Sequence, residues 1–347
     1  MIDRKIVFVL ILLILAGSIP SFSNAPVISQ TQDPVKIGIF ARFTTGGLSY
    51  CAPWVRQGFE LGLIYATTEM GYSNENKTEA GLNYELHYYD TKGSPTEAES
   101  LAIDAIEEDG IDILVGGVYD SVASVIANVA ESYEKLFFIA PASDASHTGS
   151  DFNPYMFRIA RNRWQDAAAD ITYAIDYLNC SNFAFLAADY SFGYEGVESR
   201  TDIINAKGGN VVSVQYAPIP TTDFSPYLTN LLTANAIFGI DLLFIIWQGN
   251  FAYLYSDLYS YAIRNYMNIS SPLFDFFSMN VVESSLTPPL TFENTTGSCL
   301  YGYELPNNTV NDWMVSQHIA RGITPNGAYG FPQRIPELYT ASAFATA

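Results

Sequence analysis

The stretch Asp112–Asp144, DILVGGVYDSVASVIANVAESYEKLFFIAPASD, decides the fold of this chain. Its apolar runs Asp112–Val115 and Leu136–Ala140 stop at glycine or proline, which predicts two buried strands. Between them, Val122–Tyr133 carries apolar residues at helical spacing, and the pair Asp120-Ser121 is suited to cap the start of that helix. A strand–helix–strand unit predicts two parallel strands, whose carboxyl ends lie at the sheet edge where α/β proteins bind ligands.

Ser121 is the first candidate for a ligand contact. A hydroxyl in the first turn of a helix, among free backbone N–H groups, is suited to hold a carboxylate. Capping the helix is its other role, worth about 1 kcal/mol, and the two roles are compatible.

Length and composition restrict the class of protein. The chain has 347 residues, enough for two domains, and its 49% hydrophobic and 15% charged residues indicate a globular protein. The net charge of −20, with no basic cluster, argues against nucleic-acid binding and is typical of an acidic extracellular surface.

The N-terminus has the layout of a signal peptide. Arg4 and Lys5 precede the apolar run Ile6–Gly17, and small residues follow up to Ala25. The run is short for a membrane span, which needs about 20 residues, although an uncleaved anchor is the alternative. We therefore expect residues 1–25 to direct export to the outside of the cell membrane, with residues 26–34 as a linker.

Sequons and cysteines agree with export without proving it. Five N-x-S/T acceptors occur, at Asn76, Asn179, Asn268, Asn294 and Asn307. The three cysteines are Cys51, Cys180 and Cys299, with no CxxC pair. A Cys180–Cys299 bridge and a set of buried thiols are both compatible with this count.

Strand and helix patterns alternate along the rest of the chain, which predicts an α/β protein with mostly parallel sheets. The further predicted strands are Val35–Phe40, Tyr84–Tyr89, Tyr155–Ile159, Phe183–Ala187, Val211–Tyr216, Leu242–Trp247, Leu273–Phe277 and Ser298–Tyr303. The further predicted helices are Trp54–Met70, Thr96–Glu108, Trp164–Leu178, Glu195–Ala206, Phe224–Thr233, Phe251–Tyr266, Val310–Ala320 and Glu337–Ala347. The alternation restarts after Tyr155–Arg161, which indicates a crossover between domains, and a second crossover is expected near Tyr303–Asn307.

In this order and spacing the segments resemble the type I periplasmic binding proteins, in particular the branched-chain amino-acid and amide-binding branch of ABC-transporter receptors. The segments that carry the resemblance are VKIGIFARFTTGG (35–47), YELHYYDTKGSPTEAESLAIDAIEEDGIDILVGG (84–117), SVASVIANVAESYEKLFFIAPASD (121–144), YMFRIARNRWQDAAA (155–169), DYSFGYEG (189–196), DFSPYLTNLL (223–232) and IDLLFIIWQGN (240–250). The resemblance covers about Val35 to the end, and because such chains continue beyond Glu337, we expect the sequence to be a fragment.

The resemblance implies a two-lobed α/β fold, each lobe a mostly parallel sheet flanked by helices. Residues 35–158 and 305–347 would form lobe 1, and residues 159–304 would form lobe 2. A small amino-acid-like or amide ligand would be held between lobes that close on it, for delivery to the membrane permease of an ABC importer.

The resemblance also implies a set of ligand-binding residues. Ser121 matches the serine that binds the ligand carboxylate, and Ala142, Ser143 and Asp144 match a turn that contacts the carboxylate and amine. Aromatic positions of the cleft match Tyr50, Phe192 and Trp247 in this sequence. Such rings stack on apolar groups or on ammonium groups, although any aromatic residue can equally belong to the core.

One family feature is missing. The acid that binds the ligand amine should follow the Leu273–Phe277 strand, where this chain has Ser278, Met279 and Asn280. Asp144, Asp189 and Glu283 are candidate replacements, and Asp144 itself departs from the usual threonine: it could pair with an amine or repel a carboxylate.

Catalysis finds no support in the sequence. No G-x-S-x-G, HExxH or Walker motif is present, and His87, His147 and His318 fall in different elements. We expect no cofactor, no metal and no enzyme activity. The competing interpretation is an extracellular ligand-sensing domain of a membrane signalling receptor; an exported α/β enzyme is the third.

Overall fold

The computed structural model describes residues 33–44, 52–68, 84–247, 251–270, 295–296 and 307–321. Several predicted features lie outside these residues: the N-terminal signal, Tyr50, Cys51, Glu283, Cys299, the sequons at Asn76 and Asn294, the strands 273–277 and 298–303, and the helix 337–347. Within the described segments, no helix combines the length and the apolar character that a membrane crossing requires.

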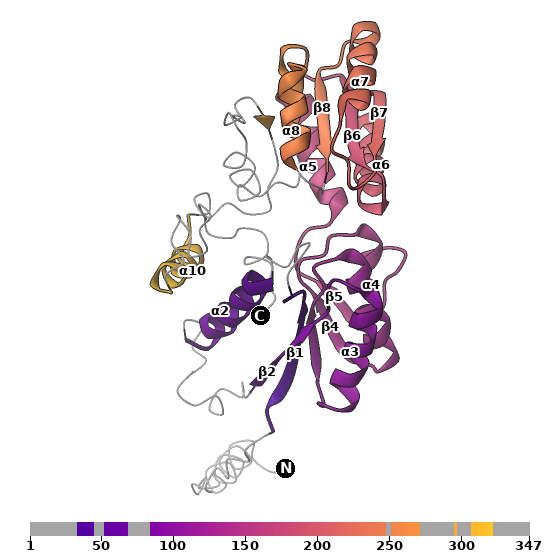
Figure 1. The fold of residues 1–347 in the computed structure, drawn as a ribbon. Helices are drawn as coiled ribbons and strands as arrows, with labels where there is room; N and C mark the ends of the chain where they lie inside the picture. The colour runs from indigo at the N-terminus through magenta and orange to yellow at the C-terminus, as the bar shows by residue number, and fades with distance from the viewer. Residues whose placement is uncertain are drawn as a thin grey trace, which may run out of the picture. The chain divides into compact units, whose positions relative to one another are not determined.

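The described chain builds two parallel sheets (Figure 1). The first sheet has the order β2-β1-β3-β4-β5 and the second the order β10-β9-β8-β6-β7. Their strands are β1 (Val35–Ala41), β2 (Tyr84–Asp90), β3 (Ile113–Gly116), β4 (Leu136–Ile139), β5 (Met156–Arg158), β6 (Asn182–Ala188), β7 (Asn210–Ala217), β8 (Leu242–Ile246), β9 (Asn268–Ser270) and β10 (Thr295–Thr296). The predicted α/β class with parallel sheets is confirmed.

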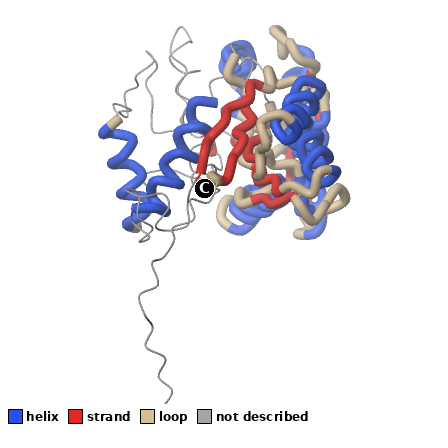
Figure 2. The backbone as a smooth tube through the Cα atoms, turned by 90° about the horizontal axis from the view of Figure 1, so that it is seen from below, coloured by secondary structure: helices blue, strands red, loops and turns tan. Residues whose placement is uncertain are grey.

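Helices cover both faces of each sheet. Figure 2 shows blue helices on either side of the red strands nearest the viewer. The helices are α2 (Ala52–Thr68), α3 (Pro95–Glu107), α4 (Asp120–Ser132), α5 (Arg163–Asp176), α6 (Ser191–Ala206), α7 (Ser225–Phe238), α8 (Phe251–Ser260) and α10 (Thr309–Ala320). In the first sheet, Phe40 packs with α3 and α4, while Ile39 packs on the other face with α2. In the second sheet, Phe183 faces α5 and α6, while Leu243 faces α7 and α8. We call β1–β5 with α2–α4 the first sheet unit, and β6–β10 with α5–α8 the second.

Strand order sets the place of a binding crevice. In the first unit the chain leaves β1 toward β2 on one side and returns to β3 on the other. In the second it leaves β6 toward β7 and returns to β8. Loops diverge at such switch points, so a ligand crevice is expected at the carboxyl ends of β3 and β6.

Some predicted boundaries are wrong. The helix α4 begins at Asp120, its N-cap is Tyr119, and no side chain caps it, so the Asp120-Ser121 pair does not act as predicted. The helix α6 begins at Ser191 rather than at Glu195, and α7 continues to Phe238, where Gly239 ends it with a φ of 69°. The predicted helix to Tyr266 stops at Ser260, and the strand β9 follows.

Cys180 is a free, buried thiol, and burial raises its pKa to about 11. The buried-thiol alternative therefore describes this cysteine.

Candidate functional site

The loop after β3 depends on glycine. Gly116 has a φ of 129°, and a Cβ there would lie 2.2 Å from the carbonyl oxygen of Phe40. Only glycine tolerates this backbone and this close approach. The tight turn brings the start of α4, at Asp120, next to the loop that follows β4.

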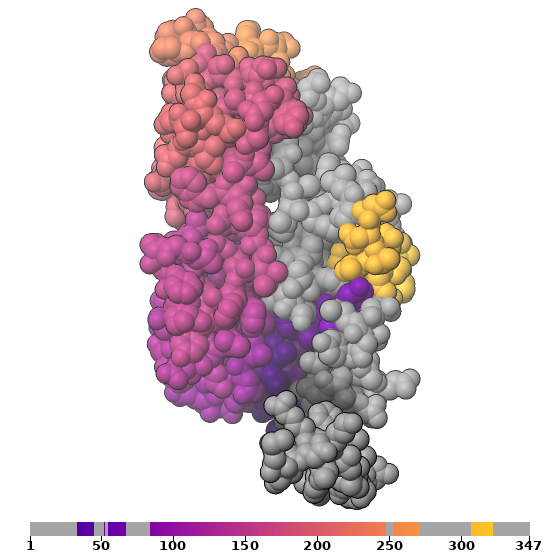
Figure 3. Space-filling model, turned by 180° about the vertical axis from the view of Figure 1, so that it is seen from behind, coloured from indigo at the N-terminus to yellow at the C-terminus, as the bar shows by residue number. Residues whose placement is uncertain are grey.

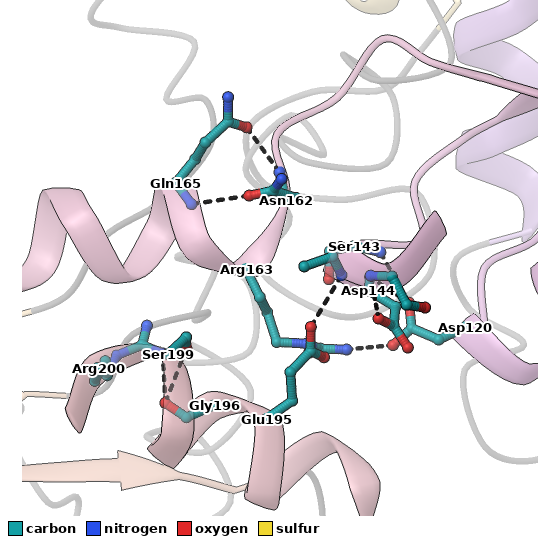
Figure 4. Close-up of polar contacts among 12 residues, drawn as sticks. Asp120, Ser143, Asp144, Asn162, Arg163, Gln165, Glu195, Gly196, Ser199 and Arg200 are labelled. Carbon is teal, nitrogen blue, oxygen red and sulfur yellow. Dashed lines mark hydrogen bonds and ion pairs between the residues drawn. The ribbon is translucent and has the colours of Figure 1, made fainter. Parts of the chain in front are cut away.

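Asp120 joins the loops of two neighbouring strands. Its Oδ1 accepts hydrogen bonds from the backbone N–H groups of Ser143, at 2.8 Å, and Asp144, at 3.0 Å (Figure 4). Asp144 in turn caps the short 3-10 helix Ala145–Thr148 by accepting from the N–H of Ser146 at 2.8 Å. The carboxylate that sequence analysis assigned to a helix cap thus fixes the Ala142–Asp144 turn instead.

Arg163 enters this edge from the second sheet unit. The helix α5 starts with a capping box in which Asn162 and Gln165 bind each other's backbone N–H groups (Figure 4). This box fixes Arg163 at the first helical position. Its side chain is 2% exposed, and it donates to the carboxylates of Asp120 and Glu195.

The helix α6 brings Phe192 and Glu195 to the same place. The guanidinium of Arg163 lies over the ring of Phe192, 4.8 Å from its centroid. Glu195 accepts from Arg163 and, at 2.9 Å, from the N–H of Ala145 in the first sheet unit. Asp120, Arg163 and Glu195 therefore form a chain of charges, the ionic bridge, which joins the two units (Figure 4).

A cavity of about 390 Å³ opens beside the ionic bridge. Both units contribute to its lining, whose described members are Asp120, Asp144, Ala145, Ser146, Gly149, Ser150, Arg163, Trp164, Ser191, Phe192 and Glu195. Figure 3 shows, in magenta to pink, the surface formed by the middle of the chain, the part of the sequence that supplies this lining. The cavity lies beyond the carboxyl ends of β3, β4 and β6, and so includes the two strand ends, of β3 and β6, where the strand order places a crevice.

The charges of the cavity shift each other's pKa. Burial lowers the pKa of Arg163, but the carboxylates of Asp120 and Glu195 outweigh burial and raise it above its ordinary value. Burial raises the pKa of Glu195, and Arg163 offsets only part of that. Burial acts to raise the pKa of Asp144, but hydrogen bonds from Ser146 and nearby positive charge, that of Arg163 included, together outweigh it, so the pKa is lowered and the group is ionised at neutral pH.

The structure separates the residues that sequence analysis grouped as ligand contacts. Asp144 and Phe192 line the cavity. Ala142 is buried and Ser143 donates its N–H to Asp120, so both belong to the turn behind the cavity wall. Ser121 is exposed in the first turn of α4 and is not in the lining.

Trp247 lies in the core of the second unit. It is 4% exposed, and its ring packs edge-on against Phe224 at 5.1 Å. Among the candidate replacements for the missing acid, Asp144 lines the cavity, whereas Asp189 does not and instead accepts from the hydroxyl of Tyr194.

Sequence reasoning missed Asp120, Arg163, Trp164 and Glu195 as cavity residues. Glu195 lies within the turn DYSFGYEG, and Arg163 lies within the crossover segment YMFRIARNRWQDAAA, so both belong to segments that carry the family resemblance. A buried arginine between two acids far away in the sequence leaves no local pattern, and no signal in the sequence pointed to the ionic bridge.

A family model described as "Periplasmic binding protein" matches residues 34–260. The chain belongs to the periplasmic binding protein family. Proteins of this family are ligand receptors and not enzymes, so this membership also answers the question of catalysis. The match covers the first sheet unit, the second unit as far as α8, and every described residue that lines the cavity.

Curated relatives and solved structures agree with this family. Over 228 residues the chain is 23% identical to Leu/Ile/Val-binding protein homolog 6 of Brucella suis, an alignment that covers 65% of this chain and 52% of the relative. The periplasmic binding protein described here thus spans about half the length of the curated relatives it matches.

Two solved structures show the same fold. An ABC-type branched-chain amino acid transporter protein of Rhodopseudomonas palustris superimposes with a TM-score of 0.70 at 26% identity, covering 90% of this chain and 77% of that one. An ABC transporter substrate-binding protein of Sphaerobacter thermophilus gives a TM-score of 0.73 at 21% identity, covering 90% and 78%.

Proposed function

We propose that this periplasmic binding protein captures a small amino-acid-like or amide solute between two closing lobes and delivers it to the permease of an ABC importer. The observation that carries the proposal is the cavity of about 390 Å³, whose lining comes from both sheet units. A solute that contacts both units stabilises their closed arrangement, and a partner can read that arrangement.

The two lobes of the proposal are residues 35–158 with 305–347, and residues 159–304. The helix α10 supports the return of the chain to the first lobe. Trp313 of α10 packs edge-on against Tyr65 of α2, with ring centroids 5.0 Å apart.

The names of similar proteins suggest two classes of solute. A leucine-binding protein of Thermotoga maritima superimposes at 17% identity, and solute-binding proteins of Rhodopseudomonas palustris, solved with benzoate and 4-hydroxybenzoate, superimpose at 19% and 16%. Amino acids, amides and aromatic carboxylates therefore form the panel that the cavity has to be tested with.

A thermal-shift screen of that panel, extended with ureas and short peptides, tests the proposal. A solute that binds only the native state raises the melting temperature. At a concentration one hundred times its Kd, it adds about 2.7 kcal/mol to the free energy of unfolding. Phe192→Ala should remove the shift, because its ring lines the cavity and supports Arg163. Phe152→Ala, at an exposed phenylalanine outside the cavity, is the control. A folded protein that no solute stabilises would refute the proposed function.

Ser121 remains a predicted ligand contact that a second variant tests. Ser121→Ala should weaken the binding of any hit if the serine binds the solute. Ser132→Ala, in the last turn of the same helix, is the matched control, since its hydroxyl donates to the carbonyl of Asn128. Equal affinities for the two variants would remove Ser121 from the site.

Delivery and export are tested on the intact protein. In a host that lacks the gene, uptake of a labelled hit should fall if the protein feeds an importer, and should persist if it is a sensory domain.

The sequons at Asn179, Asn268 and Asn307 are all exposed, as export with glycosylation requires. N-terminal sequencing of the secreted protein should find residues 1–25 removed.

A further inference from the structure

We propose that the solute of this cavity carries a cationic nitrogen group, bound by the carboxylate of Asp144 with the ring of Trp164 beside it. This inference rests on the proposed function, because it takes the cavity as the solute site and names the chemistry of its occupant.

The balance of charge around the cavity favours a cation. Among the described residues, three carboxylates line the cavity, those of Asp120, Asp144 and Glu195, against one guanidinium, that of Arg163. The other charged groups around it do not restore neutrality. Arg158 adds one positive charge behind the wall, where it donates to the backbone oxygen of Asp144 and to Thr148.

Two more groups face this wall. Arg161 is paired with Asp166, so the pair adds no net charge. Burial lowers the pKa of His147, whose Nε2 lies 3.0 Å from the hydroxyl oxygen of Ser124, so this histidine is neutral at neutral pH. The charge that the described residues place around the cavity is therefore negative.

Arg163, the cation among the described residues of the lining, already has partners. Its guanidinium donates to both Asp120 and Glu195 and covers one face of Phe192. A solute carboxylate would compete with two built-in carboxylates for this cation, and it would approach them against their repulsion. The arrangement disfavours an anion.

Asp144 differs from the other two acids of the cavity. Asp120 and Glu195 are both in ion pairs, whereas no cation of the described residues forms one with Asp144. Its carboxylate accepts from Ser146, and its lowered pKa keeps it ionised. A half-buried, ionised carboxylate facing an open cavity gains from a counter-charge, and the solute is what can supply it.

The aromatic lining agrees with a cation. Phe192 is covered by Arg163 and stacks on Tyr190, with centroids 5.8 Å apart. Trp164 is 37% exposed and lines the same cavity, so its indole is accessible to a solute. An indole face is the best aromatic partner for an organic cation.

Two charge series on fixed skeletons test the inference by calorimetry and thermal shift. The first is leucinamide, leucine, 4-methylpentanamide and 4-methylpentanoate, which are cation, zwitterion, neutral amide and anion. The second is benzylamine, benzamide and benzoate. At about pH 6.5 an α-amino group is protonated. In each series the cation should bind more tightly than the neutral amide, and the anion most weakly.

Asp144→Asn removes the charge and keeps the side-chain shape and cap, because asparagine caps helices as well as aspartate does. Binding of the cations should weaken about tenfold or more, the scale for one lost charge-assisted hydrogen bond. Binding of the neutral amides should not change. Asp202→Asn, at an exposed position of α6 outside the cavity, is the control with the same change in charge.

The outcomes separate this inference from the proposed function. An anion that binds more tightly than the cation of its series, or a hit from the wider panel without a cationic group, would overturn the cation site and leave the receptor function standing. Equal binding of leucinamide by Asp144→Asn and the parent protein would do the same. If no solute of any charge binds, the proposed function fails as well.

Discussion

Arg163 is the residue on which the junction of the two sheet units depends. Its side chain is 2% exposed and bonded to Asp120 of one unit and Glu195 of the other. Removal of one partner from a buried ionic network leaves the remaining charges uncompensated, which costs about 3–5 kcal/mol.

Arg163→Met should therefore lower the free energy of unfolding by about 3 kcal/mol, measured by urea denaturation. Lys207→Met is the control, because Lys207 forms a surface pair with Asp176 at 3.2 Å that should contribute less than about 1 kcal/mol. Equal losses for both variants would show that the ionic bridge contributes no more than a surface pair.

His318 gives the stability a defined dependence on pH. Its ring is fully buried, and burial, assisted by Arg321, lowers its pKa from 6.5 to about 4. The unfolded chain binds a proton near pH 6.5 and the folded chain only near 4, so this contribution is complete above 6.5 and is lost as the pH falls toward 4.

At about 1.4 kcal/mol per pKa unit, the loss attributable to His318 is about 3 kcal/mol. Denaturation of the parent protein and of His318→Gln across this pH range should show the variant losing less stability on acidification. His87→Gln, at a partly exposed histidine of β2, is the histidine control. Parallel curves for the parent and His318→Gln would contradict the assignment.

At the scale of elements, Gly193 sets how closely α6 approaches β6. A Cβ at this position would lie 1.9 Å from the carbonyl oxygen of Ala188. Gly193→Ala should displace the first turn of α6, which carries Phe192, and destabilise the protein by about 2–3 kcal/mol.

The control for Gly193 is a glycine with space around it. Gly208 has a φ of 82°, and no atom lies within 4 Å of the place that a Cβ would take, so Gly208→Ala should cost only the strain of the left-handed backbone, about 1 kcal/mol. Solute binding, measured with any hit of the panel, should fall for Gly193→Ala and not for Gly208→Ala. Similar effects of both variants would argue against the close approach.

Elements with a long local pattern could be predicted, and those defined by distant partners could not. The strand β8 was evident from its unbroken apolar run, and α3 from its periodicity after Ser94. The start of α4 was misplaced because Asp120 resembles a cap, while its carboxylate is bound by the Ser143–Asp144 turn and by Arg163.

The candidate site follows the same division. Asp144 and Phe192 were predicted from the resemblance, because each lies in a segment that matches the family, and both line the cavity. Trp247 was predicted from the same resemblance, but its side chain is buried against Phe224. Glu195 and Arg163 required knowledge of which loops of the two sheets meet, which only the fold supplies.

At the scale of the whole molecule, the charge of −20 opposes compactness. Raising the salt concentration from about 0.01 M to about 0.15 M shortens the screening length from about 30 Å to about 8 Å. The melting temperature should therefore rise, equally in NaCl and KCl. A fall, or a rise with only one cation, would indicate specific ion effects in place of screening.

The position of Trp164 has a practical consequence. The chain has four tryptophans, and among those whose side chains are described, Trp247 is enclosed in the core and Trp313 packs on Tyr65, while Trp164 lines the cavity. A solute that enters the cavity should change the polarity around the indole of Trp164, and with it the intrinsic fluorescence of the protein. Titrations followed by intrinsic fluorescence, with Trp164→Phe as the silent version, would measure occupancy without any attached dye.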